Sequence, residues 1–165
     1  MSIKNYIKNK KSYDCKKKIK NAGILLISYN TLPLKVLLVR DINNKKYMLP
    51  VGGIKNNDGP FRTSKREFFE ETWLKLEPLL SNKEYIYYDI EHNNSCTRIY
   101  IYFTNKDITK YDGDKIKNKD ILNKKDFYET DKIKCVELKK LYNNKFNIRY
   151  PNTIIKIVDY LNLKF

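Results

Sequence analysis

Residues 49–76, LPVGGIKNNDGPFRTSKREFFEETWLKL, decide the fold of this chain. On a helix with about 100° between successive residues, Glu67, Glu70 and Glu71 of the string REFFEE fall on one arc. The opposite arc carries apolar side chains, namely Phe61, Phe68, Phe69 and Leu76. The segment therefore predicts one amphipathic helix that packs its apolar side into a core and presents three carboxylates on its other side.

The three clustered carboxylates predict a metal site. Like charges four residues apart on a helix destabilise it by about 0.2–0.5 kcal/mol per pair, so the cluster needs a compensating partner. A hard divalent cation among the oxygens supplies one, and Mg²⁺ and Mn²⁺ both suit carboxylate ligands. We therefore expect Mg²⁺ or Mn²⁺ as the cofactor.

The stretch before the helix predicts a tight loop and a helix start. Pro50-Val51-Gly52-Gly53 carries little side chain, so its backbone carbonyls can approach a ligand. Gly59-Pro60 marks the start of the helix, because proline is favoured at the first helical position. Asp58 places a negative charge beside the helix N-terminus, where such a charge is favourable.

The whole pattern resembles the signature of the Nudix hydrolases, G-x5-E-x7-R-E-U-x-E-E-x-G-U, in which U is a bulky aliphatic residue. The match needs no gap and comprises Gly52, Arg66, Glu67, Phe68, Glu70, Glu71 and Leu74. Asp58 takes the place of the first glutamate and is one methylene shorter, which predicts a shorter or water-mediated brace to the arginine. Trp73 replaces the glycine that ends the helix. Because tryptophan does not easily adopt a left-handed cap, we expect the helix to run on toward Leu76 or to end differently.

The resemblance implies a reaction and a set of metal ligands. Nudix enzymes split a nucleoside diphosphate linked to another group by attack of water on phosphorus. Metal ions neutralise the phosphate charge and lower the pKa of bound water. By resemblance, Glu67 and Glu71 are the core metal ligands, and Glu70 binds the same ion or a second one.

The resemblance also implies supporting roles. The backbone carbonyl of Val51 or Gly52 is the expected ligand from the loop, in which Gly53 is a further supporting residue. Arg66 is expected to orient the glutamate that follows it through charge-assisted hydrogen bonds and to pair with Asp58.

The general base varies between Nudix branches. Glu67, Glu70 and an acid from a later loop are all open as candidates, and Arg66 completes the predicted catalytic set. Glu129 and Asp131 lie just before the last predicted strand, where the family often supplies an extra acidic ligand. Each is a candidate metal ligand, against the simpler interpretation of an exposed loop charge.

Length and pattern predict one domain with an α/β fold. We expect a basic N-terminal arm over residues 1–20 and a single Nudix hydrolase domain over residues 21–165. The expected strands are 22–29, 35–40, 47–50, 84–91, 97–104 and 133–138, and the expected helices are 60–74 and one that opens at 151. This order fits an α/β/α sandwich with a mixed sheet, which the resemblance also implies.

Composition points to an intracellular protein. There is no apolar run near ~18 residues and no secretory signal, so we expect no membrane partner and a cytoplasmic location. Cys15, Cys96 and Cys135 are odd in number and far apart, which predicts reduced thiols. The lone histidine, His92, is expected to be an ordinary loop or strand-end residue. The sequence indicates no protein partner.

The net charge of +15 bears on the substrate. A basic protein attracts polyanions, so the leading candidate is the 5′ cap or 5′ end of RNA, with tyrosines available to stack on bases. In its compact, lysine-rich composition the chain is similar to the mRNA-decapping Nudix enzymes of large DNA viruses. The lysine-rich residues 105–128 are a predicted loop that could serve the same purpose.

Two alternatives stay open. One is hydrolysis of a small polyanion: a dinucleoside polyphosphate, a nucleoside triphosphate, a diphosphoinositol phosphate or ADP-ribose. The other is a non-catalytic RNA-binding module on a Nudix scaffold. Its only support is the departure from the signature at Asp58 and Trp73.

Overall fold

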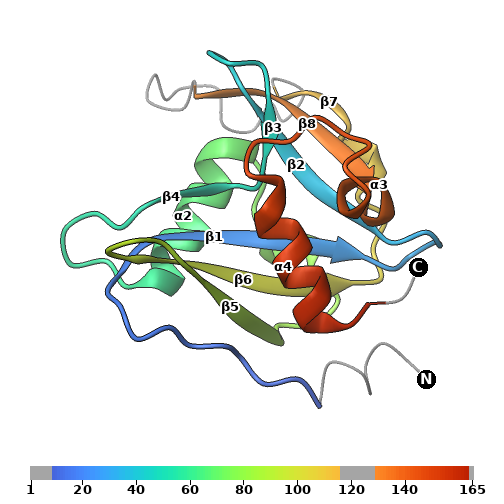
Figure 1. The fold of residues 1–165 in the computed structure, drawn as a ribbon. Helices are drawn as coiled ribbons and strands as arrows, with labels where there is room; N and C mark the ends of the chain where they lie inside the picture. Colours follow the sequence, from blue (N-terminus) through green and yellow to red (C-terminus); the bar gives the residue numbers. More distant parts are fainter. Residues whose placement is uncertain (1–8, 116–128, 164–165) are drawn as a thin grey trace.

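The computed structural model describes residues 9–115 and 129–163 (Figure 1). The strands are β1 (Ile19–Ser28), β2 (Lys35–Asp41), β3 (Tyr47–Met48), β4 (Val51–Gly53), β5 (Tyr85–Glu91), β6 (Cys96–Thr104), β7 (Gly113–Asp114) and β8 (Thr130–Glu137). The α-helices are α2 (Pro60–Thr72), α3 (Leu138–Tyr142) and α4 (Pro151–Leu161), and the 3₁₀ turns are η1 (Glu77–Leu79) and η2 (Thr109–Tyr111).

The strands of the described residues form one mixed sheet in the order β5-β6-β1-β2-β8-β7. Strands β1 and β6 run parallel along nearly their whole length, and the other pairs are antiparallel. The short strand β4 pairs with β1 and places Gly52 opposite Ala22. The loop before the signature helix is therefore fixed to the central strand of the sheet.

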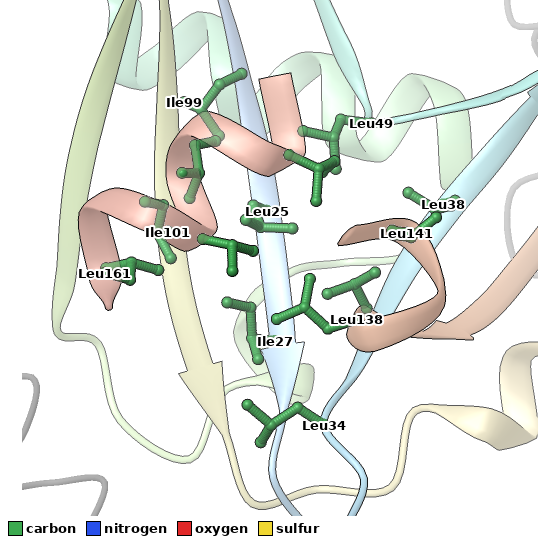
Figure 2. Packing of buried hydrophobic residues seen from close by; sticks show 14 of the residues in the cluster. Leu25, Ile27, Leu34, Leu38, Leu49, Ile99, Ile101, Leu138, Leu141 and Leu161 are labelled. Carbon is green, nitrogen blue, oxygen red and sulfur yellow. The ribbon is translucent and has the colours of Figure 1, made fainter. Parts of the chain in front are cut away.

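Strand β1 is buried on both faces, and its alternate side chains enter two different cores. Leu25 and Ile27 join a cluster with α3 and α4, which Figure 2 shows from close by. Ile24 and Leu26 join a second cluster that contains Phe68 of α2. Because successive strand residues point to opposite faces, the two helical layers cover the two sides of the sheet. Figure 1 shows α4 and α2 on these opposite faces, so the predicted α/β/α sandwich is confirmed.

The element bounds follow the sequence prediction closely, with one shift that matters for the site. Strand β8 begins at Thr130, three residues before the predicted start, and Thr130 pairs with Asp41 beyond a register shift in β2. Asp131 is therefore a strand residue, and Glu129 is the residue directly before the strand. The predicted loop 105–128 lies partly outside the described residues, as do residues 1–8 of the predicted arm.

The described part of the N-terminal segment lies along the free edge of β5. Tyr13 forms a parallel bridge with Tyr88, and its N–H donates to the carbonyl of Tyr87 at 3.0 Å. A disulfide joins Cys15 to Cys96 at the start of β6. The expectation of free thiols is thus wrong for this pair, because the segment brings two cysteines 81 residues apart in sequence into contact. Cys135 is a free cysteine.

Among the described residues, no helix has the length and apolar content needed to cross a membrane.

Candidate active site

Helix α2 turns two of its three carboxylates inward. Glu67 is 6% exposed and Glu71 is 3% exposed, because this side of the helix packs on β4 and β1. Phe68 is buried, but Phe61 is 40% exposed. The expectation of an apolar inner side and a carboxylate outer side is therefore wrong in detail: the carboxylates lie between the helix and the glycine-rich strand.

Glu71 holds the loop directly. Its Oε2 accepts a hydrogen bond from the backbone N–H of Val51 at 3.0 Å. The bond joins the last turn of α2 to β4 and fixes the position of a buried carboxylate. The glycine-rich loop is therefore held against the signature helix by a direct hydrogen bond.

Gly52 is required at its position because Glu67 occupies the space where a side chain would lie. A Cβ built on Gly52 would come within 2.1 Å of Cδ of Glu67, which no real contact tolerates. A Cβ on the neighbouring Gly53 would make only an ordinary van der Waals contact, with Oδ1 of Asn21 at 3.8 Å. The first glycine of the signature therefore admits the carboxylate of Glu67 against the backbone of β4.

Arg66 connects the loop with the other two carboxylates. Its guanidinium donates to Glu67 at 2.6 Å, to Glu70 at 3.1 Å and to the carbonyl of Gly53 at 3.0 Å. The predicted orientation of Glu67 by Arg66 is present in the structure. Asp58 lies 3.8 Å from Nε of Arg66, an ion pair without a direct hydrogen bond, as its shorter side chain leads one to expect.

Burial shapes the electrostatics of the cluster. It raises the pKa of Glu71 well above its ordinary value, and the nearby Glu67 raises this pKa further. Burial also raises the pKa of Glu67, although Arg66 opposes the change. Two carboxylates with raised pKa values beside a backbone loop mark a place where added positive charge is favourable.

The oxygen atoms of the cluster and its loop are chemically suited to bind a hard divalent cation. Oxygen ligands from Glu67, Glu70 and Glu71 and a carbonyl of Val51 or Gly52 are the kind that Mg²⁺ and Mn²⁺ prefer. In the described part of the chain, no three acidic, histidine or cysteine side chains already converge on one ion position. The carboxylates bind groups of the protein instead: Glu67 and Glu70 accept from Arg66, and Glu71 accepts from the N–H of Val51.

The two later acids differ in their surroundings. Arg40 binds both oxygens of Asp131, at 2.9 and 2.6 Å, and lowers the pKa of this carboxyl. Asp131 is thereby engaged in an ion pair between β2 and β8. Glu129 is exposed, and its charge raises the pKa of Glu71, so it belongs to the surroundings of the cluster.

Sequence reasoning missed Lys115, which lies under the C-terminal end of α2. Its side chain is buried, and its Nζ donates to the carbonyl of Glu70 at 2.8 Å and to Oγ1 of Thr130 at 3.0 Å. Nζ also lies 4.6 Å from the ring centroid of Trp73. Burial lowers the pKa of Lys115 to about 8, so the ammonium form dominates at neutral pH.

Trp73 ends the helix in the left-handed conformation, with φ 58° and ψ 22°. Its N–H donates to the carbonyl of Phe69 at 2.8 Å. We expected the helix to run on toward Leu76 or to end differently, because tryptophan does not easily adopt such a cap; the structure has the cap at Trp73, whose indole is buried against Lys115. No signal in the sequence links these two positions, which lie 42 residues apart in the chain.

A cavity of about 380 Å³ lies beside β4. Val51 belongs both to this cavity and, through its N–H, to the carboxylate cluster. Apolar side chains and a few polar groups line the cavity, among them Leu49, Ile99, Ile154, Asn21, Arg149 and Tyr150. None of its lining residues in the described chain is Asp or Glu. His92 is another lining residue, located just after β5, and its ring bonds Thr97 at 2.8 Å.

Comparisons with known proteins agree with this architecture. No protein-family model matches the chain, and no curated protein matches it by sequence. Solved structures do match. The NUDIX domain of Shewanella oneidensis NrtR, complexed with ADP ribose, is 16% identical, with a TM-score of 0.58, 98% of this chain covered and 97% of the other.

Two further structures are similar over most of their length. A C. elegans Ap4A hydrolase is 15% identical, with a TM-score of 0.59 and 87% of this chain and 98% of the other covered. The Bacillus subtilis pyrophosphohydrolase BsRppH is 16% identical, with a TM-score of 0.56 and 93% and 89% covered. The chain therefore has the Nudix fold, in agreement with the resemblance of residues 52–74 to the signature.

Proposed function

We propose that this Nudix-fold chain is a divalent-metal-dependent pyrophosphohydrolase that cleaves a phosphoanhydride bond of a nucleoside-diphosphate-linked substrate. One observation carries the proposal: Glu67 and Glu71 are buried against β4, with Gly52 leaving room for one carboxylate and Val51 binding the other. Burying two carboxylates is costly unless positive charge compensates for them, and Arg66 forms an ion pair with only one of the two, Glu67. A chain without chemistry at this place has no use for the arrangement.

The proposed roles follow from the contacts. Glu67, Glu70 and Glu71 and a carbonyl of Val51 or Gly52 would hold Mg²⁺ or Mn²⁺. When bound, the cation would neutralise phosphate charge and activate water. Glu129, which lies near the cluster, is a further candidate ligand. We do not retain Asp131, because both of its oxygens bind Arg40.

The residues around the cluster would position the reacting groups. Arg66 holds Glu67 and Glu70 through one nitrogen, Nη1, so the two carboxylates keep a fixed separation. The side chain of Glu70 is 25% exposed and that of Glu67 is 8% exposed. Either can accept the proton of the attacking water, and the pH profiles of the two Glu→Gln variants would distinguish them.

The leading substrate is the 5′ end of RNA, capped or triphosphorylated. The net charge of +15 supports this, since it attracts a polyanion and accelerates its arrival. The fold of BsRppH, a pyrophosphohydrolase, is compatible with it. In this proposal the enzyme would release the cap nucleotide or phosphates and act in mRNA decapping.

A specific observation favours a small nucleotide as the second candidate. The cavity beside β4 shares Val51 with the carboxylate cluster and has the volume and apolar lining suited to a nucleobase. A base in the cavity would place its phosphates toward the cluster. The ADP ribose bound in the NrtR complex and the Ap4A in the name of the C. elegans hydrolase are small nucleotides of this chemical kind.

The contacts of Asp58 and Trp73 weaken the case for the non-catalytic alternative, which rested on these two departures from the signature. Asp58 stays beside Arg66, and Trp73 ends the helix as the signature glycine would. Neither departure displaces Glu67 or Glu71.

A panel of substrates tests the proposal with Mg²⁺ or Mn²⁺ present. It comprises capped RNA, triphosphate RNA, dinucleoside polyphosphates, nucleoside triphosphates, ADP-ribose and diphosphoinositol phosphates, each with wild type and Glu71→Gln. Release of a methylated guanosine diphosphate from capped RNA, lost in the variant, would support decapping. Preference for a free nucleotide would support the second candidate. No turnover of any substrate, with RNA still bound, would overturn the enzymatic proposal.

A further inference from the structure

Helix α2 ends in a turn whose carbonyls are bound by groups from distant parts of the chain. The last carbonyls of any helix lack partners inside the helix. Here the Glu70 carbonyl accepts from Nζ of Lys115 at 2.8 Å, and the Glu71 carbonyl accepts from Oγ1 of Thr130 at 2.6 Å. Lys115 also donates to Oγ1 of Thr130 at 3.0 Å. The four residues form one hydrogen-bonded chain between α2 and the start of β8.

Lys115 brings a full positive charge into this buried place. The residue is 2% exposed, and its ammonium lies over the indole of Trp73 at 4.6 Å from the ring centroid. A neutral donor would satisfy a carbonyl equally well, and a buried ammonium is costly unless negative charge compensates for it. The charges of Glu71, Glu129 and Glu70 act on it favourably.

We propose that Lys115 is a built-in counter-ion of the carboxylate cluster: its ammonium, bound to the turn that carries Glu70 and Glu71, reduces the need for an added divalent cation. The inference rests on the proposed function, since it concerns the same metal site. It goes further by naming a residue outside the signature that sets the cation requirement of that site. Lys115 touches no reacting group in this account.

The counter-ion role predicts that removing the charge of Lys115 lowers the stability of the metal-free protein and raises its affinity for Mg²⁺. Lys115→Met removes the charge, so the metal-free protein should be less stable. The remaining cluster is more negative, so Mg²⁺ should bind more tightly, with half-saturation at a concentration lower by on the order of tenfold. The rise in Tm on adding Mg²⁺ should therefore be larger than in wild type.

Thr130→Val is the matched control. It removes the hydrogen bond to the Glu71 carbonyl from the same chain of contacts without changing any charge. Its Tm should fall, while its Mg²⁺ response stays that of wild type. Lys115→Gln, which keeps an N–H donor but loses the charge, should respond to Mg²⁺ as Lys115→Met does and replaces it if the methionine variant does not fold.

The experiment is a Mg²⁺ titration of Tm for wild type, Lys115→Met, Lys115→Gln, Thr130→Val and Glu71→Gln. A lower half-saturating concentration in both neutral Lys115 variants, absent in Thr130→Val, supports the inference. An unchanged or higher concentration in those variants overturns it while leaving the metal site intact. If the Tm of wild type does not change with Mg²⁺, as is expected for Glu71→Gln, the proposed metal site is overturned. The inference about Lys115 then fails with it.

Discussion

The backbone N–H of Val51 donates a 3.0 Å hydrogen bond to Oε2 of Glu71, and this bond joins two features that the sequence presents 20 residues apart. One is a strand of three residues paired with the central strand β1, and the other is the last turn of the signature helix. The same Val51 lines the cavity on its other side. A single residue thus connects the carboxylate cluster with the space in which a base would fit.

The close packing of Gly52 on Glu67 predicts a strong effect of one methyl group. In Gly52→Ala the new Cβ would lie about 2.1 Å from the Glu67 carboxyl carbon, so either the strand or the carboxylate must move. We expect a loss of roughly 1–3 kcal/mol in the free energy of unfolding and a loss of hydrolytic activity of about 100-fold. Urea unfolding and steady-state kinetics check both. Gly59→Ala is the control, since a Cβ there meets nothing within 4 Å, and equal effects of the two changes would contradict the assignment.

Arg66 should be irreplaceable by lysine. A lysine keeps the charge but cannot reach Glu67, Glu70 and the Gly53 carbonyl with one planar group, as the guanidinium does. We expect Arg66→Lys to reduce kcat by roughly 10- to 100-fold with little change in Tm. Arg62→Lys serves as the control, because the side chain of Arg62 is 81% exposed. A kcat for Arg66→Lys within twofold of wild type would show that the arginine does not position these carboxylates.

The raised pKa of Glu71 predicts a characteristic pH dependence of stability without metal. A carboxyl whose folded-state pKa lies above the unfolded value near 4.5 favours folding fully below that value, and the contribution is lost as the pH rises through the folded-state pKa. Burial above all, and then Glu67 and Glu129, raise this pKa, while the Val51 N–H and Lys115 lower it. Relative to Glu71→Gln, wild type should therefore lose stability as the pH rises above about 4.5. Urea unfolding in EDTA between pH 4.5 and pH 8 measures the difference in the free energy of unfolding between the two proteins. A difference that does not change with pH would contradict the prediction.

The Cys15–Cys96 disulfide predicts a countable difference in thiols. Under denaturing conditions without reductant, the chain should show one reactive thiol, that of Cys135, and three after reduction. In the chain-entropy description, a crosslink spanning 81 residues stabilises the fold by about 4.5 kcal/mol, so Cys15→Ser should lower stability by a comparable amount. Three reactive thiols before reduction would show that the bridge does not form in solution.

The sequence predicted the sheet, the layers and the position of the signature helix because these depend on local periodicity. Strand β1 is apolar on both faces and helix α2 begins at a Gly-Pro pair, and both features are visible in a short window. The bounds of β8 were predicted less well, since the strand is extended by pairing with β2 beyond a register shift.

The parts of the site that sequence reasoning missed depend on contacts between distant segments. Lys115 belongs to a lysine-rich stretch of sequence in which nothing distinguishes it from the other lysines. Its role depends on burial against Trp73 and Thr130, which approach only in the folded sheet. The ion pair of Asp131 with Arg40 likewise follows from the register of β2 and β8, and so does the different position of Glu129.

The proposed metal site is best tested by the Mg²⁺ dependence of phosphoanhydride hydrolysis by wild type, Glu67→Gln and Glu71→Gln, measured on the best substrate of the panel with folding verified by Tm. Wild-type turnover should rise with Mg²⁺ to saturation and be abolished by EDTA. Both variants should be folded and turn over at least about 100-fold more slowly at every Mg²⁺ concentration. Turnover in Glu71→Gln equal to that of wild type, with the same Mg²⁺ dependence, would show that Glu71 does not hold a catalytic metal ion.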